Sequence, residues 1–192
     1  MRKIVFILFI GVFGISLQAQ ETTDEKKPFL IRPYIENGIN FIRNDNLKEI
    51  YESQSMHHIG FGLQFGSPYN QKIVPYLQYA QSSMDIEKEI EPEEPQKYSM
   101  QNDQVSLGLI IHVKEVNGIY FRTKFAYSLS MIEESFNVVD NDSHGFQVGI
   151  GVEKEVLKSQ RIYMDLTYNY QKTDNDGFKD FDATRLSFGF IL

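Results

Sequence analysis

Eight separate stretches of this sequence alternate between apolar residues and small or polar residues, which is the pattern of a β-strand. Successive side chains of a strand point to opposite faces, so each stretch has one apolar face and one small or polar face. The last residues show this clearly, because Leu186, Phe188, Phe190 and Leu192 share one face. The eight predicted strands cover residues 29–41, 56–66, 73–83, 99–114, 118–132, 143–156, 161–172 and 184–192.

The connections between these strands alternate in length. Three are short, at residues 67–72, 115–118 and 157–160, and the four between them are longer or more charged, at residues 42–55, 84–98, 133–142 and 173–183. Asn117-Gly118 is a strong hairpin signal because both residue types tolerate positive φ. Outer-membrane barrels have short periplasmic turns and long external loops in this alternation. We therefore predict an all-β fold: an eight-stranded antiparallel up-and-down transmembrane barrel.

The first residues have the features of a signal peptide. Arg2 and Lys3 precede an apolar run over residues 4–17, and Ala19 offers a small-residue cleavage site. The apolar run is shorter than the ~20 residues of an anchoring helix, although a retained anchor is the alternative. The predicted organisation is a signal peptide at 1–19, a flexible lead-in at 20–28 and the barrel domain at 29–192.

Composition excludes several classes of function. The sequence has no cysteine, so it has no disulfide, no thiol catalysis and no lipoprotein anchor. Its net charge of −7 argues against a nucleic-acid partner. No stretch after residue 20 is apolar enough for a membrane helix, so a membrane location requires a closed sheet, in which every backbone group finds a partner.

The composition of the two faces indicates which one meets lipid. The face opposite the apolar one holds the glycines Gly38, Gly60, Gly62, Gly108, Gly149, Gly151 and Gly189, with Gln64, Ser106, Gln147, Thr167 and Asn169. Glycine weakens a solvent-facing strand position but suits an eight-stranded barrel, whose interior is just wide enough for side chains. We therefore expect the glycine face inside and the apolar face on lipid. The alternative is a soluble barrel such as a lipocalin, with the two faces reversed.

The predicted interior also carries charges of both signs. Strand parity places eight of them inside: Arg32, Glu36, Lys114, Arg122, Lys124, Glu153, Asp165 and Arg185. Buried charges need partners, so an interior ion-pair network is expected, with Lys124 and Glu153 at matched height. We interpret the network as structural packing, because eight strands leave no continuous aqueous pore. A gate or proton path is the functional alternative.

Aromatic residues fall near both ends of the predicted strands. The expected outer rim holds Phe41, Tyr79, Tyr127, Phe146, Tyr168 and Tyr170, and the inner rim holds Phe65, Phe121 and Phe190. Such rings collect at the two interfaces of a bilayer.

A resemblance to a known family rests on the signal peptide, the opening residues 32–38 and the closing residues 186–192. The chain resembles the small eight-stranded outer-membrane barrels, OmpX-like and OmpA-transmembrane-like, which are also described as porin-like or "outer membrane protein beta-barrel domain". The likeness covers nearly the whole mature chain and is architectural. Members of this family usually end on an aromatic residue that the barrel-assembly machinery reads. This sequence ends on Leu192, with Phe190 on the same face.

Few residues suggest a metal-binding or catalytic site. The long connections are acidic and could hold Ca²⁺ or Mg²⁺, but residues 174–177 lack the spacing of an EF-hand, and a solvated loop is the preferred interpretation. His57 and His58 point to opposite faces and cannot share one ion, and His112 is expected inside. A lipid-modifying enzyme would need a His, a Ser and a carboxylate together. His144 with Ser143 and Ser128 is the loose match to that requirement.

The leading hypothesis is a non-enzymatic outer-membrane barrel with a structural or surface-contact role in the envelope. We expect no catalytic residue, no bound metal and no cofactor. The expected partners are outer-membrane lipid and lipopolysaccharide, with the barrel-assembly machinery during biogenesis, and the protein is expected to be a monomer. A soluble periplasmic barrel binding an apolar ligand and an outer-membrane lipid-modifying enzyme are the alternatives.

Overall fold

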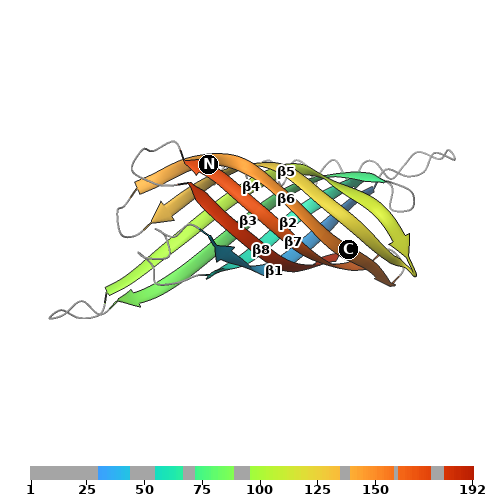
Figure 1. Cartoon of the computed structure of the whole chain (residues 1–192), viewed down its shortest axis with the longest axis horizontal. Helices are drawn as coiled ribbons and strands as arrows, with labels where there is room; N and C mark the ends of the chain where they lie inside the picture. Colours follow the sequence, from blue (N-terminus) through green and yellow to red (C-terminus); the bar gives the residue numbers. More distant parts are fainter. Residues whose placement is uncertain are drawn as a thin grey trace.

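Eight antiparallel strands close into a barrel in the computed structural model (Figure 1). The structure describes residues 30–43, 55–66, 72–88, 96–134, 139–157, 160–173 and 180–192. Each strand pairs with the next along the chain, and β1 pairs with β8 to close the sheet. The strands are β1 (Leu30–Ile42), β2 (Ser55–Gly66), β3 (Ile73–Lys88), β4 (Gln96–Val116), β5 (Ile119–Glu134), β6 (Val139–Leu157), β7 (Gln160–Thr173) and β8 (Phe181–Ile191). The predicted fold class is confirmed.

The predicted signal peptide and lead-in lie outside the described residues. Among the residues that are described, no helix is long and apolar enough to cross a membrane.

The turn between β4 and β5 has the hairpin geometry that its sequence predicts. Val116 pairs with Ile119 across the two-residue turn, where Asn117 has φ 53° and Gly118 has φ 76°. Both values lie in the left-handed region that a type I′ turn requires. This turn lies at the right of Figure 1 and defines what we call the turn end of the barrel, and the opposite end is called the loop end. Residues 67–71 and 158–159, in the other two short connections, lie outside the described residues.

Several strands extend further at the loop end than the alternation of the sequence predicts. β3 continues to Lys88 instead of ending at residue 83, and β4 begins at Gln96 instead of residue 99. The two strands stay paired over this extension, with Lys88 opposite Gln96. Backbone pairing does not depend on side-chain alternation, so the sequence pattern ends before the ladder does.

The apolar faces of the strands point outward, as predicted. Leu107 is 65% exposed and Ile150 is 62% exposed, whereas Ser106 and Gln147, which have the opposite parity on the same two strands, are buried. Leu63 departs from the pattern, because it is only 3% exposed although it has the parity of the outward residues.

Three inward glycines make room for three buried tyrosines. A Cβ added at Gly62 would overlap the ring of Tyr34, and one added at Gly189 would overlap the ring of Tyr163. The nearest contacts of a Cβ at Gly108 include the ring of Tyr76. The predicted inward glycines therefore have a specific use, because they are the places where large interior side chains meet the wall.

The interior holds two apolar clusters at different heights. One lies at the loop end and consists of Ile42, Met56, Met84, Met100, Ile132, Phe181 and Ala183. The other contains the three tyrosines and consists of Tyr34, Val74, Tyr76, Ile110, Ala126, Tyr163 and Ile191. We call the first the loop-end cluster. It was not expected from the sequence, and it occupies the loop end of the interior with side chains that carry no charge.

The tyrosine packing gives a first prediction. Gly62→Val should lower the free energy of unfolding by about 1–3 kcal/mol, the usual cost of overpacking, because the new side chain overlaps Tyr34. Urea unfolding of the protein in lipid vesicles measures this loss. Adding Tyr34→Ala to Gly62→Val should recover part of it. A double variant no more stable than Gly62→Val alone would contradict the proposed contact.

Candidate functional site

The charged side chains of the barrel interior form the candidate site. Seven of the eight charges that the sequence places inside are buried there: Arg32, Glu36, Arg122, Lys124, Glu153, Asp165 and Arg185. They come from strands β1, β5, β6, β7 and β8, so residues distant in sequence meet in one lumen.

Lys114 is the exception, and its predicted inward position is wrong. The register between β4 and β5 shifts between His112 and Lys114, so Lys114 is opposite Phe121, an exposed residue of the outer face. The extra residue of this β-bulge is Val113, and a bulge reverses the parity of the residues that follow it. Lys114 is accordingly exposed on the outer wall.

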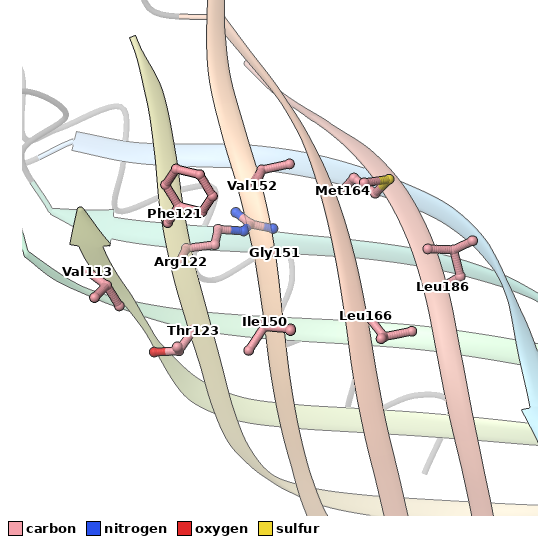
Figure 2. A pocket seen from close by; sticks show the side chains of 10 residues that line it. All are labelled: Val113, Phe121, Arg122, Thr123, Ile150, Gly151, Val152, Met164, Leu166 and Leu186. Carbon is pink, nitrogen blue, oxygen red and sulfur yellow. The ribbon is translucent and has the colours of Figure 1, made fainter. Parts of the chain in front are cut away.

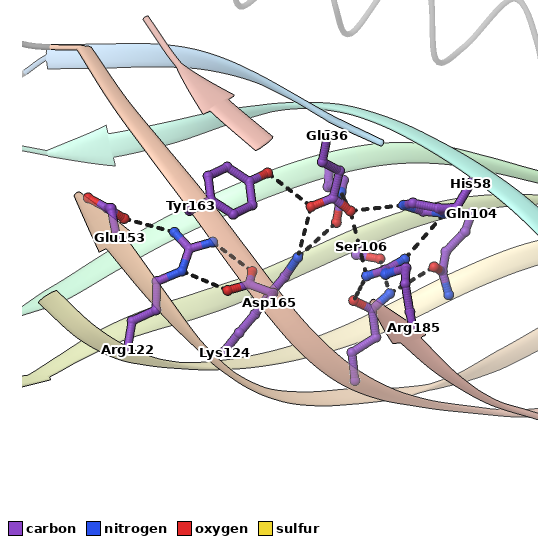
Figure 3. Close-up of polar contacts among 12 residues, drawn as sticks. Glu36, His58, Gln104, Ser106, Arg122, Lys124, Glu153, Tyr163, Asp165 and Arg185 are labelled. Atoms are coloured by element: carbon purple, nitrogen blue, oxygen red, sulfur yellow. Dashed lines mark hydrogen bonds and ion pairs between the residues drawn. The ribbon is translucent and has the colours of Figure 1, made fainter. Parts of the chain in front are cut away.

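Glu36 is the centre of the first group of contacts (Figure 3). Its Oε1 atom lies 2.9 Å from His58 Nε2 and accepts a hydrogen bond of 2.6 Å from Gln78 Nε2. Its Oε2 atom accepts a hydrogen bond of 3.0 Å from the hydroxyl of Tyr163. These partners belong to β2, β3 and β7, so one carboxylate of β1 is bonded across the whole lumen.

Two cations complete the surroundings of Glu36. Lys124 Nζ is 3.8 Å from Oε2, and Arg185 Nη2 is 3.7 Å from Oε1. The expected matched height of Lys124 and Glu153 is wrong. Lys124 is in register with Gly149, and Glu153 lies further toward the turn end.

The second group joins Arg122 to two carboxylates. Arg122 donates from Nε and Nη2 to the two carboxylate oxygens of Asp165, at 2.8 and 2.6 Å, and from Nη1 to Glu153 at 2.8 Å. Arg161 Nη1 donates to the other Glu153 oxygen at 2.7 Å. The Arg122 guanidinium also stacks over Tyr163, 4.0 Å from the ring centroid. Tyr163 thereby connects the two groups.

A layer of amides lies between the charges and the loop-end cluster. Arg185 Nη2 donates to Gln147 at 3.2 Å. Gln147 Nε2 donates to Gln104 at 2.8 Å and to Ser106 at 2.9 Å. Gln104 in turn donates to Asn169 at 3.3 Å. These contacts connect Arg185 of β8 to uncharged side chains of β4, β6 and β7.

The chemistry of this arrangement is that of a packed interior. The oxygens of Glu36 and Asp165 and those of Glu153 each face donors from other strands. Buried charges are tolerated when their geometry and hydrogen bonds are complete, and removing one partner is strongly destabilising. The contacts hold strands at fixed positions across the lumen.

The histidines lie apart from one another. His58 is buried between Glu36 and Ser82, while His57 is exposed on the other face of β2. His112 Nε2 is 3.4 Å from Glu153 Oε2 near the turn end. Within the described residues, no group of three His, Asp or Glu side chains comes together to hold a metal ion.

The residues that loosely match a lipid-modifying site, His144, Ser143 and Ser128, do not come together in the structure. Ser143 is buried and its Oγ lies 2.6 Å from Ser130 Oγ, whereas His144, the next residue, points to the opposite face of β6. Ser128 is buried as well. The three residues therefore do not converge.

Parts of the acidic connections are described. Asp180 accepts a hydrogen bond of 2.5 Å from the hydroxyl of Tyr170. Residues 89–95, 135–138 and 174–179 lie outside the described part of the chain, so the possible cation sites there remain sequence predictions.

Sequence reasoning missed several members of the interior network: His58, Gln78, Arg161 and Tyr163. All four have inward parity on their strands, so a stricter count of parity would have placed them inside. Their partners across the lumen could not have been found this way, because parity assigns a face and not an opposite strand.

The network generates a second prediction. Glu36→Gln should lower the free energy of unfolding by about 3–5 kcal/mol, because Lys124 and Arg185 would remain buried without a counter-charge. Urea unfolding in vesicles measures the change. The control is Asp85→Asn, which removes an exposed carboxylate at the loop end and should leave the unfolding midpoint unchanged. Equal effects of the two substitutions would argue against a central role for Glu36.

Comparisons with known proteins support the fold. No protein-family model matches the sequence. No curated protein matches it either. The structure is similar to the crystal structure of Neisserial surface protein A, with a TM-score of 0.58 and 14% sequence identity over 85% of this chain and 96% of that one. It is also similar, at a TM-score of 0.48, to Ail, the attachment invasion locus protein of Yersinia pestis, with 12% identity over 84% of this chain and 96% of that one. The likeness to Neisserial surface protein A shows that this chain has the fold of the small eight-stranded outer-membrane barrels.

Proposed function

We propose that the protein is a non-enzymatic barrel of a bacterial outer membrane, with a structural or surface-contact role in the envelope. The observation that carries this proposal is the division of the wall into two chemistries. The outer face presents apolar side chains on every strand, and the inner face buries charged and polar side chains together with two apolar clusters. A bilayer is the environment in which both faces are satisfied.

The same division argues against a soluble barrel that binds an apolar ligand. Such a barrel needs an apolar cavity inside and polar residues outside. Here the exposed residues include Leu107, Leu129 and Phe188, each more than half exposed, while Arg122 and Glu153 are buried inside. Soluble monomers rarely expose apolar patches larger than a few hundred Å².

Aromatic side chains support a bilayer boundary at the loop end. Tyr127, Phe146 and Tyr170 lie in register across β5, β6 and β7. The rings of Phe146 and Tyr170 are 5.6 Å apart. Aromatic rings collect at the interface of an outer-membrane barrel.

The proposed role lies at the loop end, which by the pattern of outer-membrane barrels faces the cell exterior. We do not assign this role to the lumen, because the loop-end cluster and the ion-pair network occupy the interior. The connections at this end are rich in carboxylates, which suit contact with cations, lipopolysaccharide or other surfaces. We further propose that the protein is delivered by a cleaved signal peptide, folded by the barrel-assembly machinery and present as a monomer.

The absence of cysteine makes the proposed orientation directly testable. In whole cells, a membrane-impermeant maleimide should label Glu93→Cys, in a long connection, but should label Asn117→Cys, in the β4–β5 turn, only after permeabilisation. The native protein is the unlabelled control. Extraction that requires detergent, and different gel mobility before and after boiling, should accompany this result. Release by salt or carbonate would overturn the membrane assignment, and the reverse labelling pattern would overturn the orientation.

The apolar band yields a further prediction. Leu109→Arg should lower the free energy of unfolding in vesicles by about 2–4 kcal/mol, because it places a charge among acyl chains near the middle of the bilayer. Glu93→Arg, which adds the same side chain in a long connection, should be tolerated. Equal tolerance of the two substitutions would contradict the lipid-facing position of Leu109.

A further inference from the structure

An apolar furrow crosses the outer wall of the barrel over strands β5 to β8 (Figure 2). It lies between two rows of outward side chains. The row nearer the turn end is Phe121, Val152 and Met164, and the other row is Thr123, Ile150 and Leu166. The hollow has a volume of about 430 Å³. This surface belongs to the face that we assign to lipid, so the further inference rests on the proposed function.

The depth of the furrow follows from the residues between the two rows. Arg122 and Gly151 lie between them, and the side chain of Arg122 points inward to Asp165. The floor of the furrow is therefore formed by backbone atoms. Thr123 is also short compared with Phe121 and Phe125, its outward neighbours on β5, so the wall is low where the furrow crosses this strand.

The β-bulge of β4 lies at one end of the furrow. Val113, the extra residue of the bulge, lines the hollow, and Lys114 is in register with Phe121, at the end of the row nearer the turn. The bulge therefore places an exposed lysine on the outer face, directly beside an apolar hollow. Because Lys114 is close to the Asn117-Gly118 turn, its long side chain can extend to the bilayer interface.

A second lysine lies nearby on the same face. Lys154 is exposed and in register with Ile119 and Ile162, between the furrow and the turn end. The neighbouring carboxylates have the opposite parity. Glu115 is in register with Tyr120 and Glu155 with Arg161, both on the lumen side of the wall. The outer wall at this place therefore combines an apolar hollow with two positive charges at its interfacial edge.

We propose that the furrow binds an acyl chain of an anionic glycerophospholipid of the periplasmic leaflet, whose phosphate is bound by Lys114 and Lys154. A lysine near a bilayer surface attracts anionic headgroups, and its apolar stem packs along the wall. The chain and the phosphate are recognised by adjacent parts of one surface. The two furrow rows bind the chain, and the lysines select the headgroup.

The experiment uses the full mature protein folded in detergent micelles and titrated with either phosphatidylglycerol or phosphatidylcholine of identical acyl chains. Native mass spectrometry measures the fraction of barrels that retain one lipid. We expect phosphatidylglycerol to be retained preferentially. Lys114→Gln should reduce this preference about fivefold, the effect of one lysine near an anionic surface, while Lys114→Arg should preserve it. Lys172→Gln, which removes an exposed lysine at the loop end, is the matched control and should change nothing.

A second variant tests the furrow itself. Thr123→Phe fills the hollow beside Phe121 and Ile150, so it should reduce the retention of both lipids. Inorganic phosphate should not compete at lipid-equivalent concentrations, because it has no chain to bind the furrow. Gel mobility before and after boiling verifies that every variant is folded.

Each of the following results would overturn the proposal: no preference for phosphatidylglycerol, equal effects of Lys114→Gln and Lys172→Gln, or unchanged retention in Thr123→Phe. Competition by inorganic phosphate would show that the lysines bind phosphate independently of the furrow and would overturn it as well. If the native protein instead stays folded and monomeric without any detergent, this result would contradict the proposed membrane location. Failure of the lipid site and failure of the proposed function are thus distinguishable.

Discussion

The hydrogen bonds between β1 and β8 are the interaction on which the rest of the structure depends. They join the first and last strands over Tyr34 to Ile42 and leave the described sheet with no open edge. Closure by eight strands also fixes the size of the interior, which is just wide enough for side chains. Every inward side chain must therefore fit this interior and find a partner there, and every outward side chain must suit the surroundings of the outer face.

The interior meets this demand by combining very small and very large residues. Glycines lie where Tyr34 and Tyr163 reach the wall, and Glu36 and Arg122 fill the space between them with directed contacts. A buried ion pair is seldom worth more than the apolar packing that could replace it, but breaking it is costly. The network therefore constrains which strands lie opposite one another more than it adds to stability. This explains why one carboxylate, Glu36, contacts side chains from five other strands.

Strand parity accounts for how much of this structure was predictable from the sequence. Parity is a local property, so it correctly separated Leu109 and Ile150 from Gly149 and Gly151, and the Asn117-Gly118 dipeptide correctly located a turn. Contacts across the lumen depend on how the strands are staggered around the barrel, which no single strand encodes. Lys124 accordingly pairs with Glu36 and not with Glu153. The loop-end cluster was missed for a different reason: Met56 and Met100 have inward parity, but the sequence argument described the interior only by its glycines, polar residues and charges.

The bulge of β4 shows how one irregular residue changes both faces of the wall. Without it, Lys114 would have the inward parity that the sequence suggests. Among the described residues, the buried interior already holds five arginine or lysine side chains and only three carboxylates. A further inward lysine would add to this excess of positive charge, and a buried charge without a partner carries a large desolvation cost. By turning Lys114 outward near the turn end, the bulge removes this charge from the lumen and places it where its ammonium group reaches water and phosphate. One positive charge fewer in the lumen and a charged edge on the outer face are then two consequences of the same extra residue.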